Sequence, residues 1–224
     1  AGFRCITFDN RGIGATENAI GFSTDQAVAD TASLINKVVG GPVRVVGVSM
    51  GSFIAQELMV ARPELVSSAV LMATRGREDR ARTFFREAER ALLAAGIELP
   101  PEVDAKNRLL ENFSPKTLND DRAVQDWIEM FTMWPTKPTP GLRAQLAVAP
   151  ETNRLPAYRQ IAVPVQVIGF ADDVVLPPHL SKEVADAIPL GRYLEIPDAG
   201  HLGFIERPDA VNAAMLEFFA ANPV

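Results

Sequence analysis

Apolar residues along the chain follow two patterns, one with the length of a β-strand and one with the spacing of an α-helix. Apolar runs of strand length occupy residues 3–9, 43–48, 67–74, 163–170 and 193–196. Apolar positions at helical spacing occupy residues 24–39, 51–62, 177–188 and 208–219. Strands that alternate with helices predict right-handed crossovers and a mostly parallel sheet flanked by helices, which is the α/β class.

The alternation stops between residues 75 and 161, where the pattern is helical and almost free of strand signals. One helix there is expected to bury an apolar face made of Ala81, Phe84, Phe85, Ala88, Leu92 and Ala95. Its charged residues are expected on a solvated face: Arg82, Arg86, Glu87, Glu89 and Arg90. We therefore predict a core in two parts, 1–74 and 162–224, with an all-helical cap at 75–161 inserted between them.

A stripe of aromatic and methionine side chains lies in the second half of this helical region. Its members recur at helical spacing and are Trp127, Met130, Phe131 and Trp134. Such a stripe could line a substrate pocket, because methionine adapts to varied apolar shapes. It could equally pack against neighbouring helices, and the pattern leaves both interpretations open.

Composition and charge narrow the classes of function. The 224 residues are 47% apolar with a net charge of −6, which suits a folded domain and argues against a nucleic-acid partner. The sequence has no leader pattern and no apolar run that could span a membrane, so we expect a cytoplasmic protein acting on a small molecule. Cys5, the single cysteine, is expected to be buried in a strand. Nothing in the pattern predicts an oligomeric state.

The strongest motif is Gly47-Val48-Ser49-Met50-Gly51, which stands between a valine-rich run and a helical pattern. The run at 43–48 has the length of a strand buried on both faces. A G-x-S-x-G sequence between a strand and a helix is the context of a nucleophile elbow, a sharp turn that presents a serine. We expect the flanking glycines to prevent a collision between strand and helix. Ser52, directly after the motif, is expected to matter little.

An acid and a base follow later strands of the predicted sheet. Asp172 or Asp173 comes after the run at 163–170, and His201 comes after the last strand. The carboxyl ends of parallel strands meet at one edge of a sheet, where such folds bind ligands. A histidine can take the serine proton, and a carboxylate can orient the imidazole. The other histidine, His179, is expected at the surface of a helix start.

Other kinds of site find little support. Two histidines and one cysteine are too few for a zinc site, and no phosphate-binding loop is present. Serine at the elbow also excludes the epoxide-hydrolase and dehalogenase chemistries, which need a carboxylate at that position.

The chain resembles the α/β-hydrolases, and within them the cofactor-free, non-haem bromoperoxidases and haloperoxidases and the esterases related to them. The segments that carry the resemblance are Asp9-Asn10-Arg11-Gly12-Ile13-Gly14, Ser49-Met50-Gly51, Gly169-Phe170-Ala171-Asp172 and Asp198-Ala199-Gly200-His201. The resemblance implies a catalytic triad of Ser49, Asp172 and His201, with Asp172 as the acid. It also implies ester hydrolysis through an acyl-serine, and perhydrolysis in which a released peracid oxidises halide, with no metal, haem or other cofactor.

The chain also departs from the pattern of that family in one respect. Members of that family have further strands before the first strand found here, and a loop after one of them donates to the oxyanion. The Met50 N–H is then the single oxyanion-hole donor that this chain supplies. We therefore expect an unpaired sheet edge and a requirement for an upstream segment of the same protein.

Two other functions are compatible with the same residues. A lyase or carbon–carbon bond hydrolase would use the triad for proton transfer. A ligand receptor would keep the triad and turn over slowly. An active-site probe and product analysis would distinguish them.

Overall fold

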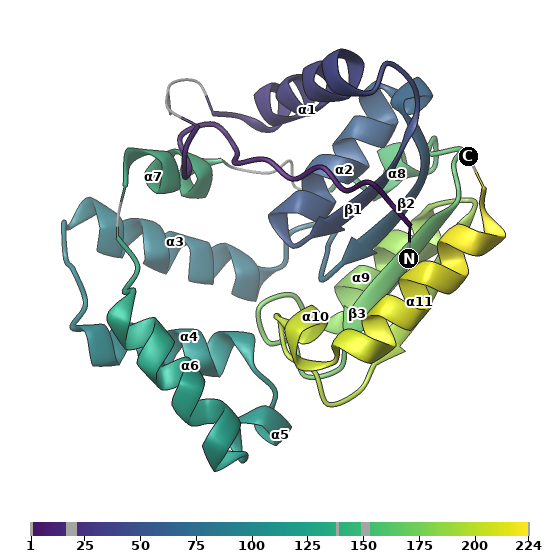
Figure 1. The fold of residues 1–224 in the computed structure, drawn as a ribbon. Helices are drawn as coiled ribbons and strands as arrows, with labels where there is room; N and C mark the ends of the chain where they lie inside the picture. The colour runs from purple at the N-terminus through teal and green to yellow at the C-terminus, as the bar shows by residue number, and fades with distance from the viewer. Residues whose placement is uncertain (1, 17–21, 138, 149–152, 224) are drawn as a thin grey trace.

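The computed structural model describes residues 2–16, 22–137, 139–148 and 153–223 (Figure 1). Its centre is a four-stranded sheet made of β1 (Val43–Val48), β2 (Val66–Met72), β3 (Val165–Phe170) and β4 (Gly191–Ile196). The strands lie in the order β1-β2-β3-β4, and each neighbouring pair is parallel. The α/β class and the parallel sheet are confirmed.

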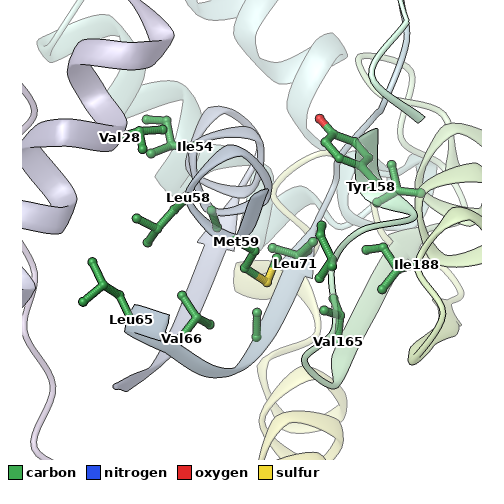
Figure 2. Close-up of a cluster of buried hydrophobic side chains, with 14 of the residues drawn as sticks. Val28, Ile54, Leu58, Met59, Leu65, Val66, Leu71, Tyr158, Val165 and Ile188 are labelled. Carbon is green, nitrogen blue, oxygen red and sulfur yellow. The ribbon is translucent and has the colours of Figure 1, made fainter. Parts of the chain in front are cut away.

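Helices cover both faces of this sheet, because alternate side chains of the strands point to opposite sides. One face packs against α2 (Met50–Ala61) and α9 (Pro178–Ala187), with α1 (Thr24–Val38) lying on α2. Figure 2 shows this cluster, which includes Leu58 of α2, Leu71 of β2 and Val165 of β3. Short elements also border it: η1 (Pro63–Leu65) and α8 (Leu155–Tyr158).

The opposite face of the sheet packs against α11 (Pro208–Ala221), the last helix of the chain. Val70, Ile168 and Ile196 from three neighbouring strands contact Phe218 and Phe219 of that helix in a second buried cluster. The short helix α10 (Gly203–Glu206) leads into α11. Among the described helices, none is long and apolar enough to cross a bilayer.

The strand β1 lies at one end of the sheet and is less buried than expected. Val46 on β1 is 49% exposed, so the prediction of a strand buried on both faces is wrong. Within the described part of the chain, residues 3–9 form neither strand nor helix, and Cys5 is exposed, which contradicts both expectations for that segment. Apolar character predicts burial only where a neighbouring element covers the residue, and no described strand flanks β1 on its outer side. The requirement for an upstream segment stays a prediction.

The part of the chain that connects β2 to β3 forms a group of helices, which lies to one side of the sheet (Figure 1). They are α3 (Arg80–Ala94), α4 (Pro101–Asn112), α5 (Pro115–Leu118), α6 (Asp121–Met133) and α7 (Pro140–Ala147). The helical character expected for this region is confirmed for its described residues. The division into a core at 1–74 and 162–224 and a cap at 75–161 stays a prediction.

The helix α3 does not bury the apolar face that its sequence suggests. Its residues are all described, and none of them is buried. Phe84 is 63% exposed and Phe85 is 50% exposed. The expectation for this face is therefore wrong. Helical periodicity indicates which residues share a face, but it does not say that a neighbour covers that face.

Candidate active site

Ser49 occupies the sharp turn between β1 and α2 that the sequence predicts. Its backbone has φ 52° and ψ −117°, which is a strained conformation for a residue with a side chain. A Cβ atom on Gly47 would lie 2.6 Å from the backbone of Gly51 and from the nitrogen of Ser52. Only glycine at position 47 therefore lets the strand approach the helix this closely.

The second glycine of the motif is not required for the same reason. A Cβ on Gly51 would meet no described atom within 4 Å, apart from neighbours in its own chain segment. The expectation that both glycines prevent a collision is thus confirmed for Gly47 and wrong for Gly51. The backbone of residue 51 fills the space that a side chain at position 47 would need, and this backbone would be the same with alanine at position 51.

Ser52 has a structural role that the sequence did not suggest. Its fully buried hydroxyl accepts a hydrogen bond from the Met72 N–H at 2.9 Å and donates to the Met72 carbonyl at 2.9 Å. The Ser49 N–H also donates to the Met72 carbonyl at 2.9 Å. The end of β2 therefore holds the turn at Ser49 itself and again at Ser52, and the expectation that Ser52 matters little is wrong.

A chain of hydrogen bonds connects Ser49 to a histidine and a carboxylate. His201 Nε2 lies 3.0 Å from Ser49 Oγ, and His201 Nδ1 lies 2.8 Å from Asp173 Oδ2. His201 is 8% exposed as a whole residue and Asp173 is 3% exposed. With Asp173 ionised, the contacts assign the proton to Nδ1, which leaves Nε2 to accept from the serine hydroxyl. The other histidine, His179, is exposed on α9, as expected.

The carboxylate beside His201 belongs to Asp173, so the structure contradicts the choice of Asp172. The Asp172 N–H donates to the Ala199 carbonyl at 2.9 Å, which continues the pairing with the segment after β4. The strand ends at Phe170 as predicted, and after the turn at 171–172 Asp173 Oδ1 accepts from the Val175 and Leu176 N–H groups at 2.9 and 2.7 Å. An aspartate that caps the next two or three amides is typical of an Asx turn, a signal that would have favoured Asp173.

The loop that carries His201 is held by a distant part of the chain. The Leu202 N–H donates to the Asn112 carbonyl at the end of α4 at 3.0 Å. A Cβ on Gly200 would lie 2.7 Å from that same carbonyl oxygen and 2.7 Å from the Phe113 carbonyl carbon. Glycine at position 200 therefore allows the histidine loop to lie directly on the connection between α4 and α5.

Glu206 links the same two segments through its carboxylate. Oε1 accepts hydrogen bonds from the Ser114 N–H at 2.9 Å, the Ser114 hydroxyl at 2.6 Å and the Thr117 hydroxyl at 2.6 Å. Oε2 accepts from the Gly200 N–H, next to His201. Charged acceptors make stronger hydrogen bonds than neutral ones, so Glu206 is a major connection between α5 and the histidine loop. The sequence analysis missed this residue.

A cavity of about 290 Å³ opens beside Ser49. Its wall includes Ser49, Met50 and Phe53 from the elbow and the helix after it, together with residues of α3 and α7. As the first residue of α2, Met50 has an N–H without an acceptor in its own helix, and the described residues offer no other. This N–H is available to an oxygen atom of a bound molecule.

The aromatic stripe of α6 does not line this cavity. Trp127 and Phe131 stack with Phe113, with ring centroids 4.7 and 6.1 Å from that ring. Met130 packs on the same cluster, and Trp134 is 64% exposed. The proposal that Trp127, Met130, Phe131 and Trp134 line the pocket is therefore wrong for this cavity, and the packing interpretation holds for the first three. Aromatic rings in contact stabilise one another beyond the area they bury, which favours packing of this stripe against Phe113.

Charged residues of α3 line the cavity instead, contrary to the expectation of a fully solvated face. Arg82, Arg86 and Glu89 are on its wall, and Arg75 joins them from the end of β2. The Glu78 carboxylate bridges Arg75 and Arg86, with both nitrogen–oxygen distances at 2.6 Å. Burial lowers the pKa of Arg75 and raises the pKa of Glu89 from their usual values.

The comparisons with known proteins agree with this architecture. Residues 1–214 match the model of the Alpha/beta hydrolase family. A Mycobacterium tuberculosis H37Rv protein named "Putative non-heme bromoperoxidase BpoC" is 74% identical over 221 residues, which are 99% of this chain and 84% of the relative. Its crystal structure gives a TM-score of 0.96 at 72% identity and covers 100% of this chain and 83% of that one.

More distant relatives have other names. A protein of Azorhizobium caulinodans named "Putative carbamate hydrolase RutD" is 28% identical over 217 residues, or 95% of this chain and 80% of the relative. A thermophilic esterase from Thermogutta terrifontis shares the fold, with a TM-score of 0.77 at 22% identity over 96% of this chain and 78% of that one. The family model matches residues 1–214 of this chain, and one relative is 74% identical over 99% of it. This chain therefore belongs to the α/β-hydrolase family.

Proposed function

We propose that the chain is a serine hydrolase that forms an acyl-serine on Ser49. The observation that carries the proposal is the hydrogen-bonded series Ser49–His201–Asp173, with Ser49 on the wall of a cavity. A serine hydroxyl is a weak nucleophile until a neighbouring base takes its proton. His201 Nε2 is within reach of that proton, and Asp173 holds the opposite ring nitrogen. The acid of this proposal is Asp173 in place of Asp172.

The reaction proceeds in two steps. Ser49 Oγ attacks the carbonyl carbon of the substrate while His201 takes the proton, and the Met50 N–H stabilises the oxyanion. His201 then returns the proton to the leaving alcohol, and the acyl group stays on Ser49. In the second step, His201 takes a proton from water, the hydroxide adds to the acyl carbon, and Ser49 leaves with its proton restored. Asp173 stabilises the imidazolium in both steps.

The finer proposal is a perhydrolase activity of the non-haem haloperoxidase type. Hydrogen peroxide takes the place of water, so the acyl-serine is released as a peracid. The peracid then transfers its terminal OH oxygen, with its proton, to bromide, which becomes hypobromous acid, and the peracid is left as the carboxylate. The similarity to a relative named as a bromoperoxidase supports this step.

An active-site probe tests the proposal directly. A fluorophosphonate should phosphonylate Ser49 in the native chain, detected as one mass increment on the peptide that contains residue 49. The Ser49→Ala variant should take up no label and lose hydrolysis of 4-nitrophenyl esters by about 10³-fold or more. Bromination of a dione in the presence of an ester, peroxide and bromide should disappear in the same variant.

The controls separate the other functions. A chain that is labelled on Ser49 but leaves simple esters intact points to a lyase or carbon–carbon bond hydrolase. A chain that is not labelled and turns over nothing, although it is folded, would contradict the proposal.

A further inference from the structure

The cavity beside Ser49 contains hydrogen-bond donors without acceptors. Arg82 Nε and Nη1 are buried and have no hydrogen-bond partner among the described residues. Gln145 Nε2 is likewise buried without a partner in the described part of the chain. Both side chains line the cavity that also holds Ser49. Buried donors without acceptors are costly, so a ligand that supplies acceptors would be strongly favoured here.

These donors come from two helices that lie beside each other. Arg82 is in the first turn of α3 and Gln145 is in α7, which contacts α3 (Figure 1). The Arg82 guanidinium lies 5.0 Å from the centre of the Phe85 ring, a contact that leaves its N–H edge available. The aromatic ring thus helps to hold the group at the wall.

The charges around the cavity favour an anion. Three guanidinium groups line it, from Arg75, Arg82 and Arg86, against one carboxylate, Glu89. Glu78 does not line the cavity; it forms ion pairs with Arg75 and Arg86, but not with Arg82. Asp79 accepts the backbone N–H of Arg82 as the helix N-cap. Arg82 is therefore the guanidinium of this group whose side-chain N–H donors are not already used by a described carboxylate.

We propose that Arg82, with Gln145, binds a carboxylate of the substrate while Ser49 attacks an ester carbonyl of the same molecule. The substrate class is then a half-ester of a dicarboxylic acid, or an ester with an equivalent acidic group, and not a purely apolar ester. A planar carboxylate matches the two N–H groups of one guanidinium edge. The inference rests on the proposed hydrolase function.

The test compares esters that differ at one end only. The 4-nitrophenyl half-esters of dicarboxylic acids from five to eight carbons carry a carboxylate where the 4-nitrophenyl alkanoates of equal length carry a methyl group. We expect kcat/KM to favour the half-ester for at least one length. In Arg82→Gln, the ratio of half-ester to alkanoate kcat/KM should fall about ten- to a hundred-fold, mainly through KM, because a hydrogen bond to a charged group is lost.

The matched control is Arg90→Gln on the same helix, an exposed residue outside the cavity wall. It should leave the ratio unchanged. The inference is wrong if Arg82→Gln changes both esters equally, or if no half-ester is preferred at any length.

A binding measurement keeps the inference separate from the hydrolase proposal. Monomethyl adipate and methyl hexanoate can be titrated calorimetrically into Ser49→Ala and into Ser49→Ala with Arg82→Gln. If monomethyl adipate binds more tightly than methyl hexanoate, and the difference disappears in the variant without Arg82, the inference is supported, even if no ester is turned over. Equal binding of acid and neutral ligands to both variants overturns it, even if Ser49 reacts with a fluorophosphonate.

Discussion

The two sides of the site are built in different ways. Ser49 is positioned by residues close to it along the chain: Gly47 gives the close approach, and Ser52 ties the turn to Met72. His201 is positioned by residues far along the chain: Asn112 and, through Glu206, Ser114 hold its loop on one side, and Asp173 holds its ring on the other. The nucleophile is therefore specified by a local motif, whereas the base depends on tertiary contacts with α4 and α5.

This difference has a consequence for how each side fails. A change at the elbow should damage the fold, because a strained turn is maintained only by its surroundings. A change in the contacts of the histidine loop should reduce catalysis more than stability, because the loop can move without disrupting the sheet. Variants on each side can separate these two kinds of effect.

The largest effect is expected on the histidine side, for Asp173→Asn. The amide would no longer fix the proton on His201 Nδ1, so Nε2 would cease to be a base in most molecules. Turnover of an aryl ester should fall by about 10⁴-fold, as is typical when such an acid is neutralised without a change of shape. Steady-state kinetics of the purified variant measures this.

The neighbouring residue provides the control. Asp172→Asn should stay within a few-fold of the native kcat, because the structure gives the Asp172 carboxylate no contact with His201. Equal losses in the two variants would mean that the assignment of the acid to Asp173 is wrong.

The next effect concerns the elbow and is a loss of stability. In Gly47→Ala the new methyl group would meet backbone atoms at 2.6 Å, and backbone cannot rotate away as a side chain can. We expect the free energy of unfolding to fall by about 3 kcal/mol, measured by urea denaturation. Gly51→Ala, where the space is open, should be neutral or raise it by about 0.5–1 kcal/mol because alanine favours the helix. Similar losses for both glycines would contradict a specific role for position 47.

The same contrast explains what the sequence could predict. Strand, turn and helix around Ser49 follow from the chain pattern, because their determinants lie within a short stretch. The order of strands after it follows from the alternation of elements. The choice between Asp172 and Asp173 depends on which of the two carboxylates meets His201 after the turn that follows β3, a detail that apolar periodicity does not fix.

The residues of the cavity wall could not be predicted from the sequence pattern, for a related reason. Arg82 and Arg86 have the spacing of an exposed face, and only the tertiary structure, in which α3 contacts α7, puts them on the wall of the cavity that holds Ser49. Trp127 and Phe131 have the apolar character of a pocket, but Phe113 is a better partner for their rings. Glu206 carries no motif, since its role depends on Ser114 and Thr117, about ninety positions earlier.

The smallest effect is expected for Glu206→Gln, which tests the tertiary side of the comparison. Glutamine has the same shape, but its NH₂ group cannot accept from the Gly200 N–H, and its single oxygen cannot serve both segments. We expect a loss of about 2 kcal/mol in the free energy of unfolding, the cost of an unsatisfied buried donor and a lost charge. We also expect kcat to fall about 10-fold as His201 is displaced.

The exposed Glu217 on α11 supplies the matched control, because Glu217→Gln removes the same charge without a described contact. It should change neither value. In Glu206→Gln, loss of kcat with KM retained would locate the defect at His201, since the cavity wall formed by α3 and α7 does not include Glu206. A variant that loses stability but keeps its full kcat would show that the loop holds His201 without this carboxylate, and the base would then be as locally determined as the nucleophile.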